Sequence, residues 1–130
     1  MARILIVDDE PAVRSLLRRV LVDAGHEVVG MSDGAAGLEA ATTAMPRFDL
    51  VVTNNCMPHL SGEQLVARLR RQFPHQPILH LDDMSIPGPT DLPGDVPNLY
   101  KPFNPDRLLQ QVEQLLAHSD KAARVNPAEA

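Results

Sequence analysis

The apolar residues of this chain fall into five short runs that alternate with segments of helical periodicity. The runs are rich in Ile, Leu and Val, and they cover residues 3–7, 26–31, 50–52, 78–81 and 99–100. Short apolar runs without alternation are typical of strands that are covered on both faces of a parallel sheet. Between them, apolar residues recur at i, i+3 and i+4 after Pro11, after Ser61 and after Asn104. Strands alternating with helices predict an α/β fold with right-handed crossovers.

The interval between the last two runs breaks this alternation. Residues 82–97 contain two glycines and four prolines, namely Gly88, Gly94, Pro87, Pro89, Pro93 and Pro97. An interior proline costs a helix about 3 kcal/mol. The sequence therefore predicts an extended loop here and no regular helix.

Length and charge narrow the class of protein. With 130 residues the chain is predicted to form one domain over residues 1–118, followed by a flexible tail over 119–130. A net charge of −5 argues against a nucleic-acid binder, and a single cysteine excludes an intrachain disulfide. The few apolar residues before Asp8 are too short for a signal peptide or a membrane span. The expected compartment is the cytoplasm.

Polar residues follow three of the apolar runs. Asp8-Asp9 follows the first run, Asn54-Asn55 the third, and Lys101-Pro102-Phe103 the fifth. Open α/β sheets bind ligands at the carboxyl ends of their strands. Adjacent carboxylates favour a hard cation with oxygen ligands, Mg²⁺ above all, although they also suit the start of a helix at Pro11. The three strand ends together favour the cation pocket.

These residues resemble the receiver domain of bacterial response regulators, and the resemblance extends over nearly the whole chain. It rests on Asp8-Asp9, on the stretch from Asn54 through Met57-Pro58 to Gly62, and on Lys101-Pro102-Phe103. It implies a flavodoxin-like, doubly wound, five-stranded parallel sheet of order 2-1-3-4-5, with the fourth helix replaced here by the proline-rich loop. It also implies a signalling module of a two-component phosphorelay rather than an enzyme. Its partners would be proteins, such as a sensor histidine kinase or a downstream signalling protein.

The resemblance assigns roles to single residues. Asn54 stands where the family has the aspartate that accepts a phosphoryl group, and Lys101 is the cation on the phosphate side. Asp8, Asp9 and the backbone carbonyl of Cys56 would bind Mg²⁺, weakly or not at all because Asn54 is neutral. An acyl phosphate needs a carboxylate nucleophile, so Asn54 cannot carry the family's reaction.

Two further departures affect the site. Asp82 stands where the family usually has threonine or serine, and Asn98 stands where it usually has tyrosine or phenylalanine. Asp82 either brings a carboxylate to the phosphate side or points to solvent.

The origin of Asn54 is open between a naturally divergent receiver and an engineered replacement in an ordinary one. The departures at Asp82 and Asn98 favour the natural origin, and the codon in the source gene would separate the two. A metal-dependent phosphatase is disfavoured because the first strand is not followed by Asp-x-Asp. A dinucleotide site is disfavoured because no Gly-x-Gly-x-x-Gly is present.

Overall fold

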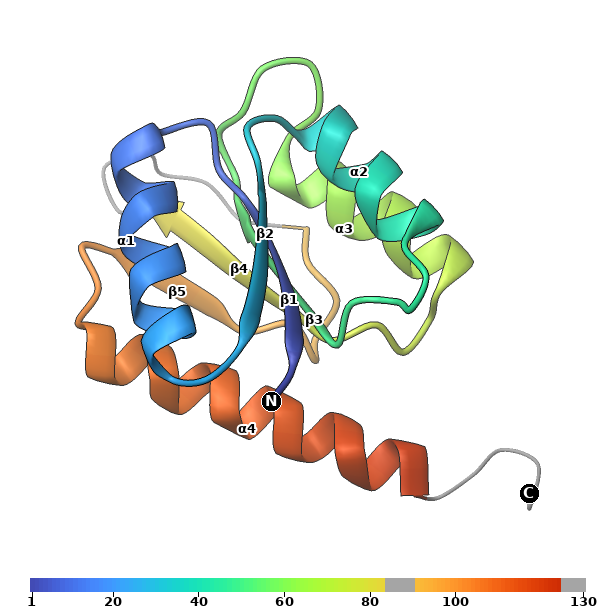
Figure 1. Cartoon of the computed structure of the whole chain (residues 1–130). Helices are drawn as coiled ribbons and strands as arrows, with labels where there is room; N and C mark the ends of the chain where they lie inside the picture. The colour runs from blue at the N-terminus through green and yellow to red at the C-terminus, as the bar shows by residue number, and fades with distance from the viewer. Residues whose placement is uncertain (84–90, 125–130) are drawn as a thin grey trace.

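Five parallel strands form one sheet in the order β2-β1-β3-β4-β5 in the computed structural model, which describes residues 1–83 and 91–124 (Figure 1). Side chains are described as far as His118. The strands are β1 (Arg3–Val7), β2 (Glu27–Met31), β3 (Leu50–Asn54), β4 (Ile78–Asp83) and β5 (Asn98–Lys101). The helices are α1 (Pro11–Asp23), α2 (Gly34–Thr43), α3 (Gly62–Gln72) and α4 (Pro105–Arg124). The predicted fold class and strand order are confirmed.

The helices cover the sheet in two layers. Helices α1 and α4 lie against one face, and α2 and α3 lie against the other (Figure 1). Ile4 and Ile6 of β1 pack toward Leu17 and Leu108, whereas the alternate residues of the strand join the α2/α3 side. Because successive strand residues point to opposite faces, both faces are apolar, and this explains the continuous apolar runs in the sequence.

The helix starts follow from local side-chain chemistry. Pro11 occupies the first turn of α1. Ser61 and Gln64 form a reciprocal capping box at the start of α3, with bonds of 3.2 and 3.0 Å. The Asn104 side-chain oxygen accepts a 2.7 Å bond from the Asp106 backbone N–H at the start of α4. These three starts agree with the sequence-based expectation.

One predicted boundary is wrong. β4 continues through Asp82 and Asp83, which the sequence places in the loop, because they pair with Tyr100 and Lys101 of β5. Helix α4 continues through a further turn to Arg124, and the flexible tail expected over 119–130 stays a prediction. The added turn contains alanine, lysine and arginine, which are good helix formers. Residues 125–130 lie outside the described part of the chain.

Residues 91–97 of the proline-rich connection pack on the α2/α3 side of the sheet and include a turn, in which the Val96 N–H donates to the Pro93 carbonyl at 3.0 Å. Residues 91–97 contain no helix, as predicted, and residues 84–90 lie outside the described part of the chain. Leu92 and Val96 pack against the α2/α3 core in place of a helix face. Arg70 of α3 donates two bonds to the Asp95 carboxylate, at 3.0 and 2.9 Å, and this pair fastens the segment to α3.

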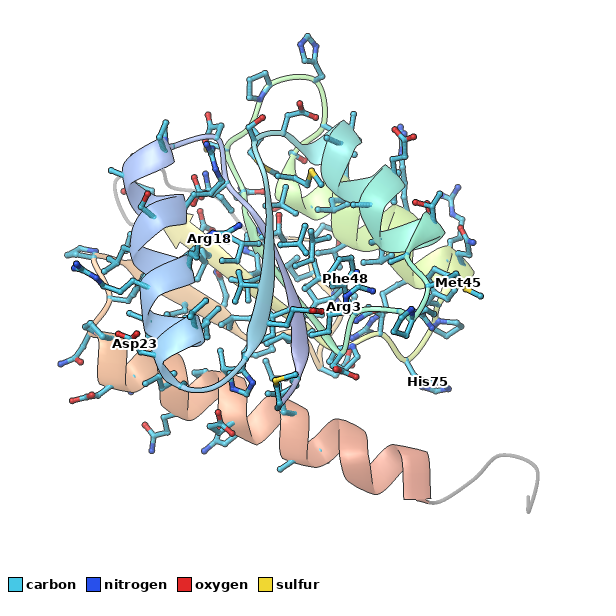
Figure 2. All side chains as sticks on the ribbon, in the orientation of Figure 1. Arg3, Arg18, Asp23, Met45, Phe48 and His75 are labelled. Carbon is cyan, nitrogen blue, oxygen red and sulfur yellow. The ribbon has the colours of Figure 1, made fainter. Side chains whose placement is uncertain are left out.

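A cationic and an aromatic side chain pack together at the amino ends of the strands. Phe48 is buried, and the Arg3 guanidinium carbon lies 4.7 Å from its ring centroid (Figure 2). Within residues 1–83 and 91–124, no helix has the length and apolar character that a bilayer crossing requires.

Candidate functional site

The carboxyl ends of β1 and β3 bring the predicted site residues together. Val7 pairs with Thr53, so the residues that follow, Asp8 and Asn54, are neighbours at the edge of the sheet. Helix α3 starts unusually close to this edge. A Cβ at Gly62 would lie 2.3 Å from the Asn54 carbonyl oxygen, so a residue with a side chain does not fit there.

An acidic cluster lies at the end of β1. The carboxylates of Asp8, Asp9 and Glu10 have oxygen atoms within 4.8 Å of one another. The Lys101 ammonium lies 3.2 Å from Asp8 and 3.7 Å from Glu10. The Lys101–Pro102 peptide bond in this loop is cis. The cluster is therefore partly neutralised by a cation that belongs to the chain itself.

Asp8 is the buried member of the cluster. Its side chain has no exposed surface, and burial raises the pKa of its carboxyl above 3.8. The Glu10 backbone N–H, 2.9 Å from the carboxylate, and Lys101 oppose that increase in the pKa. The ionised form of Asp8 consequently needs nearby positive charge or N–H donors.

Asn54 is buried beside this cluster, with 5% of its surface exposed. Its side-chain nitrogen donates to the Cys56 carbonyl at 3.1 Å and to the Asp9 carboxylate at 3.4 Å. The carboxamide therefore links the end of β1 to the turn that follows β3.

Asp82 belongs to a second group of polar side chains. Its carboxylate accepts bonds from the Asp83 backbone N–H at 2.9 Å and from the Asn98 side-chain nitrogen at 3.4 Å. The Asn98 side-chain oxygen lies 2.9 Å from Nδ1 of His80, which is fully buried. Because Asn98 donates to Asp82, its oxygen must accept from His80. Asp82 has 5% of its surface exposed, and the Asn98 side chain of β5 holds its carboxylate.

The structure places the predicted site residues in two sets. Asp8, Asp9, Asn54, Lys101 and the Cys56 carbonyl converge at one edge of the sheet. Asp82 is buried rather than directed to solvent, and its hydrogen bonds go to Asp83 and Asn98 instead of to Lys101. Their roles toward a cation or a phosphoryl group stay predictions.

Sequence reasoning missed Glu10. The sequence suggests that the acids before Pro11 favour a helix start, and Glu10 is indeed the N-cap residue of α1. Its side chain makes no capping bond, however, and it lies near Lys101. The run of three consecutive acidic residues, Asp8-Asp9-Glu10, is the sequence signal that could have identified Glu10 as a member of the site.

The donor atoms at this edge suit a hard divalent cation. They are carboxylate oxygens of Asp8, Asp9 and Glu10 and the carbonyl oxygen of Cys56, and Mg²⁺ prefers oxygen ligands. The residues present therefore fit the ion in chemistry and in proximity.

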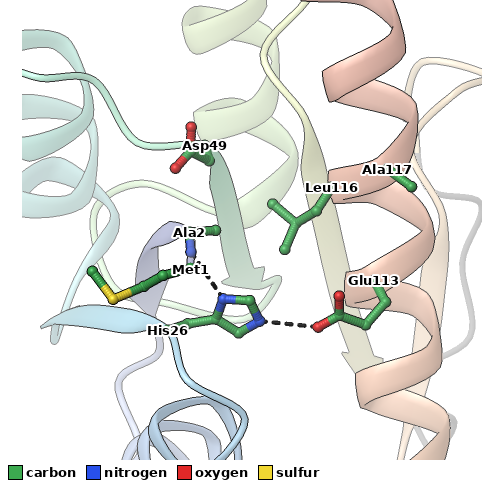
Figure 3. A pocket seen from close by; sticks show the side chains of 7 residues that line it. All are labelled: Met1, Ala2, His26, Asp49, Glu113, Leu116 and Ala117. Carbon is green, nitrogen blue, oxygen red and sulfur yellow. Dashed lines mark hydrogen bonds and ion pairs between the residues drawn. The ribbon is translucent and has the colours of Figure 1, made fainter.

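A separate cavity lies at the amino end of the strands, between β1 and α4 (Figure 3). Its volume is about 300 Å³, and His26 is one of the residues that line it. Nδ1 of His26 accepts a bond from the Ala2 N–H at 3.1 Å, and Nε2 donates to the Glu113 carboxylate at 3.0 Å. Both ring nitrogens of His26 are thus engaged in hydrogen bonds within the protein. The stronger candidate site is the edge of the sheet that carries Asp8, Asp9, Glu10 and the Cys56 carbonyl, called the acidic edge below.

Comparison with known proteins identifies the family to which this sequence is similar. The family model described as the response regulator receiver domain matches residues 4–87. The chain is 36% identical over 118 residues to the transcriptional regulatory protein TcrA of Mycobacterium tuberculosis, covering 87% of this chain and 45% of TcrA. It is 34% identical to the alkaline phosphatase synthesis transcriptional regulatory protein PhoP of Bacillus subtilis, covering 93% of this chain and 51% of PhoP. The chain thus spans about half the length of these two regulators.

Among solved structures, the chain is similar to the chemotaxis protein CheY4 of Vibrio cholerae. The two share 33% sequence identity with a TM-score of 0.76, over 88% of this chain and 98% of CheY4.

Proposed function

Because the chain belongs to the receiver domains of response regulators, we propose that it is a two-component signalling module whose state does not depend on phosphorylation. The observation that carries the proposal is Asn54. It stands at the phosphoacceptor position, and its neutral carboxamide is a poor nucleophile that is already engaged as a hydrogen-bond donor. No acyl phosphate forms on an amide, so the module acts through protein contacts in one fixed state.

The expected partners are proteins. A sensor histidine kinase or a downstream signalling protein fits a receiver, and TcrA and PhoP are themselves named as transcriptional regulatory proteins. We expect the module to bind neither nucleic acid nor a membrane and to have no catalytic activity of its own. Its expected location is the cytoplasm.

The site residues divide the remaining roles. Asp8, Asp9 and the Cys56 carbonyl would hold Mg²⁺, and Lys101 and Asp82 would face an incoming phosphate. A bound Mg²⁺ would supply positive charge against the carboxylates. We expect that binding to be weak, because position 54 adds no charge.

An ordinary receiver with an engineered change at position 54 is the second candidate. The retained ion pair of Lys101 with Asp8, at 3.2 Å, favours it, because that part of the pocket is intact.

Intact mass after incubation with acetyl phosphate and Mg²⁺ tests the proposal. We expect no phosphoryl adduct on the wild type. Asn54→Asp is the positive comparison, and Asn55→Asp is the matched control, because the Asn55 side chain accepts from the Glu63 N–H on α3 instead of facing Asp9. A phosphoryl adduct on the wild type, mapped to a residue of the acidic edge, would refute phosphorylation independence. Efficient modification of Asn54→Asp would favour the engineered origin.

A further inference from the structure

The carboxamide of Asn54 joins two oxygen atoms that belong to the predicted cation site. Its nitrogen donates to the Cys56 carbonyl at 3.1 Å and to the Asp9 carboxylate at 3.4 Å. A primary amide nitrogen carries two hydrogens, so it can serve both acceptors at once. Without a donor between them, two such oxygens facing each other repel.

Asp8, the third predicted ligand, also accepts hydrogen bonds from groups of the chain itself. One oxygen of Asp8 accepts from the Glu10 backbone N–H at 2.9 Å, and the other accepts from the Lys101 ammonium at 3.2 Å. Each oxygen-bearing group of the predicted Mg²⁺ site is therefore bonded to an N–H donor of the same chain.

We propose that the Asn54 carboxamide takes the place of the divalent cation, by holding Asp9 and the Cys56 carbonyl together through its two N–H groups. The acidic edge is then assembled without metal, and Mg²⁺ must displace the amide before it can bind. This inference rests on the proposed function, in which Asn54 is the working residue of the site.

An opposing arrangement makes the proposal testable. If Asn54 acted as an ordinary ligand through its side-chain oxygen, removing the amide would weaken Mg²⁺ binding. If the amide competes with the ion, removing it frees Asp9 and the Cys56 carbonyl and strengthens Mg²⁺ binding. The two arrangements therefore predict opposite signs for one substitution.

The experiment is a Mg²⁺ titration followed by backbone amide NMR signals of Asp9 and Cys56. The variants are Asn54→Ala and Asn54→Ser, whose side chains are too short to reach both oxygens. Asn104→Ala is the matched control, because it also removes an asparagine side chain but only uncaps α4. We expect Asn54→Ala and Asn54→Ser to bind Mg²⁺ at least about tenfold more tightly than the wild type, since two hydrogen bonds no longer compete. We expect the Asn104→Ala midpoint to match the wild type.

Equal or weaker Mg²⁺ binding by both position-54 variants would overturn the proposal, and Asn54→Ser keeps the test valid if Asn54→Ala does not fold. This outcome is independent of the proposed function, which depends on whether the wild type accepts a phosphoryl group. A chain that resists phosphorylation but loses Mg²⁺ affinity without the amide would refute only the inference made here.

Discussion

Replacing Asn54 with aspartate should destabilise the metal-free protein. The change puts a carboxylate oxygen where a nitrogen now lies 3.4 Å from the Asp9 carboxylate. Two unit charges about 3.4 Å apart repel by about 5 kcal/mol at an effective dielectric of about 20. The loss of two hydrogen bonds adds about 1 kcal/mol each.

Proton uptake sets a ceiling on that repulsion. Keeping an aspartate protonated at about pH 7 costs about 4 kcal/mol, so the pair takes up a proton instead of exceeding that value. Asp9 is exposed, and solvent screens it further. We therefore expect Asn54→Asp to lose about 2–4 kcal/mol of unfolding free energy near pH 7 in a chelator.

Urea unfolding at neutral and acidic pH, with EDTA or with Mg²⁺, measures this loss. Because the new carboxyl has a folded-state pKa above its unfolded value, the destabilisation should grow as the pH rises and shrink in acid. Mg²⁺ should restore stability to Asn54→Asp but not to the control Asn55→Asp. Equal stability of Asn54→Asp and wild type in EDTA at both pH values would show that position 54 does not face Asp9.

Three further predictions concern the surroundings of the site. Asn54→Asp with Asp82→Thr should give more phosphoprotein by intact mass than Asn54→Asp alone, because a charge about 6 Å from the phosphoryl group costs up to about 3 kcal/mol; equal yields would place Asp82 away from the phosphate. Burial raises the pKa of Asp8, so its contribution to stability is present below 3.8 and is lost as the pH rises through the raised value. In urea unfolding the difference between Asp8→Asn and wild type should therefore change with pH, and a constant difference would contradict this. The Arg70 hydrogen bonds lower the pKa of Asp95, so that pair stabilises above 3.8 and weakens as the pH falls. Since the Asp95 side chain is 68% exposed, Asp95→Asn should lower the unfolding free energy in urea by less than about 1 kcal/mol. A larger loss at acidic than at neutral pH would contradict a stabilising Arg70–Asp95 pair.

Much of the fold can be predicted from the sequence because its signals are local and agree with one another. Apolar runs of strand length, the Ser61–Gln64 box and the proline at the start of α1 each specify one element. The end of β4 from Asp82 on could not be predicted in this way. Asp82 lies in β4 through pairing with β5.

The sequence predicts which residues form the site better than it predicts how their side chains are arranged. Strand ends and family resemblance identify Asp8, Asp9, Asn54 and Lys101, which converge as expected. The direction in which the Asn54 amide donates depends on the path of the turn through Cys56, and no sequence pattern encodes that path.

The polar group around Asp82 could not be predicted for a similar reason. It depends on cross-strand neighbours, because His80 pairs with Asn98 in the register of β4 with β5. The two residues become neighbours only through the β4–β5 register, which the sequence alone does not specify.

The side-chain amide signals of Asn54 in a ¹⁵N–¹H spectrum test the central claim most directly. They report on the atoms that link Asp9 to the Cys56 carbonyl. We expect these signals to keep their positions when EDTA is replaced by millimolar Mg²⁺ and then by Mg²⁺ with acetyl phosphate. The Asn104 side-chain amide serves as the internal reference. A shift or loss of the Asn54 signals at millimolar Mg²⁺, with the reference unchanged, would show that the cation displaces the amide readily and would contradict a site held by Asn54.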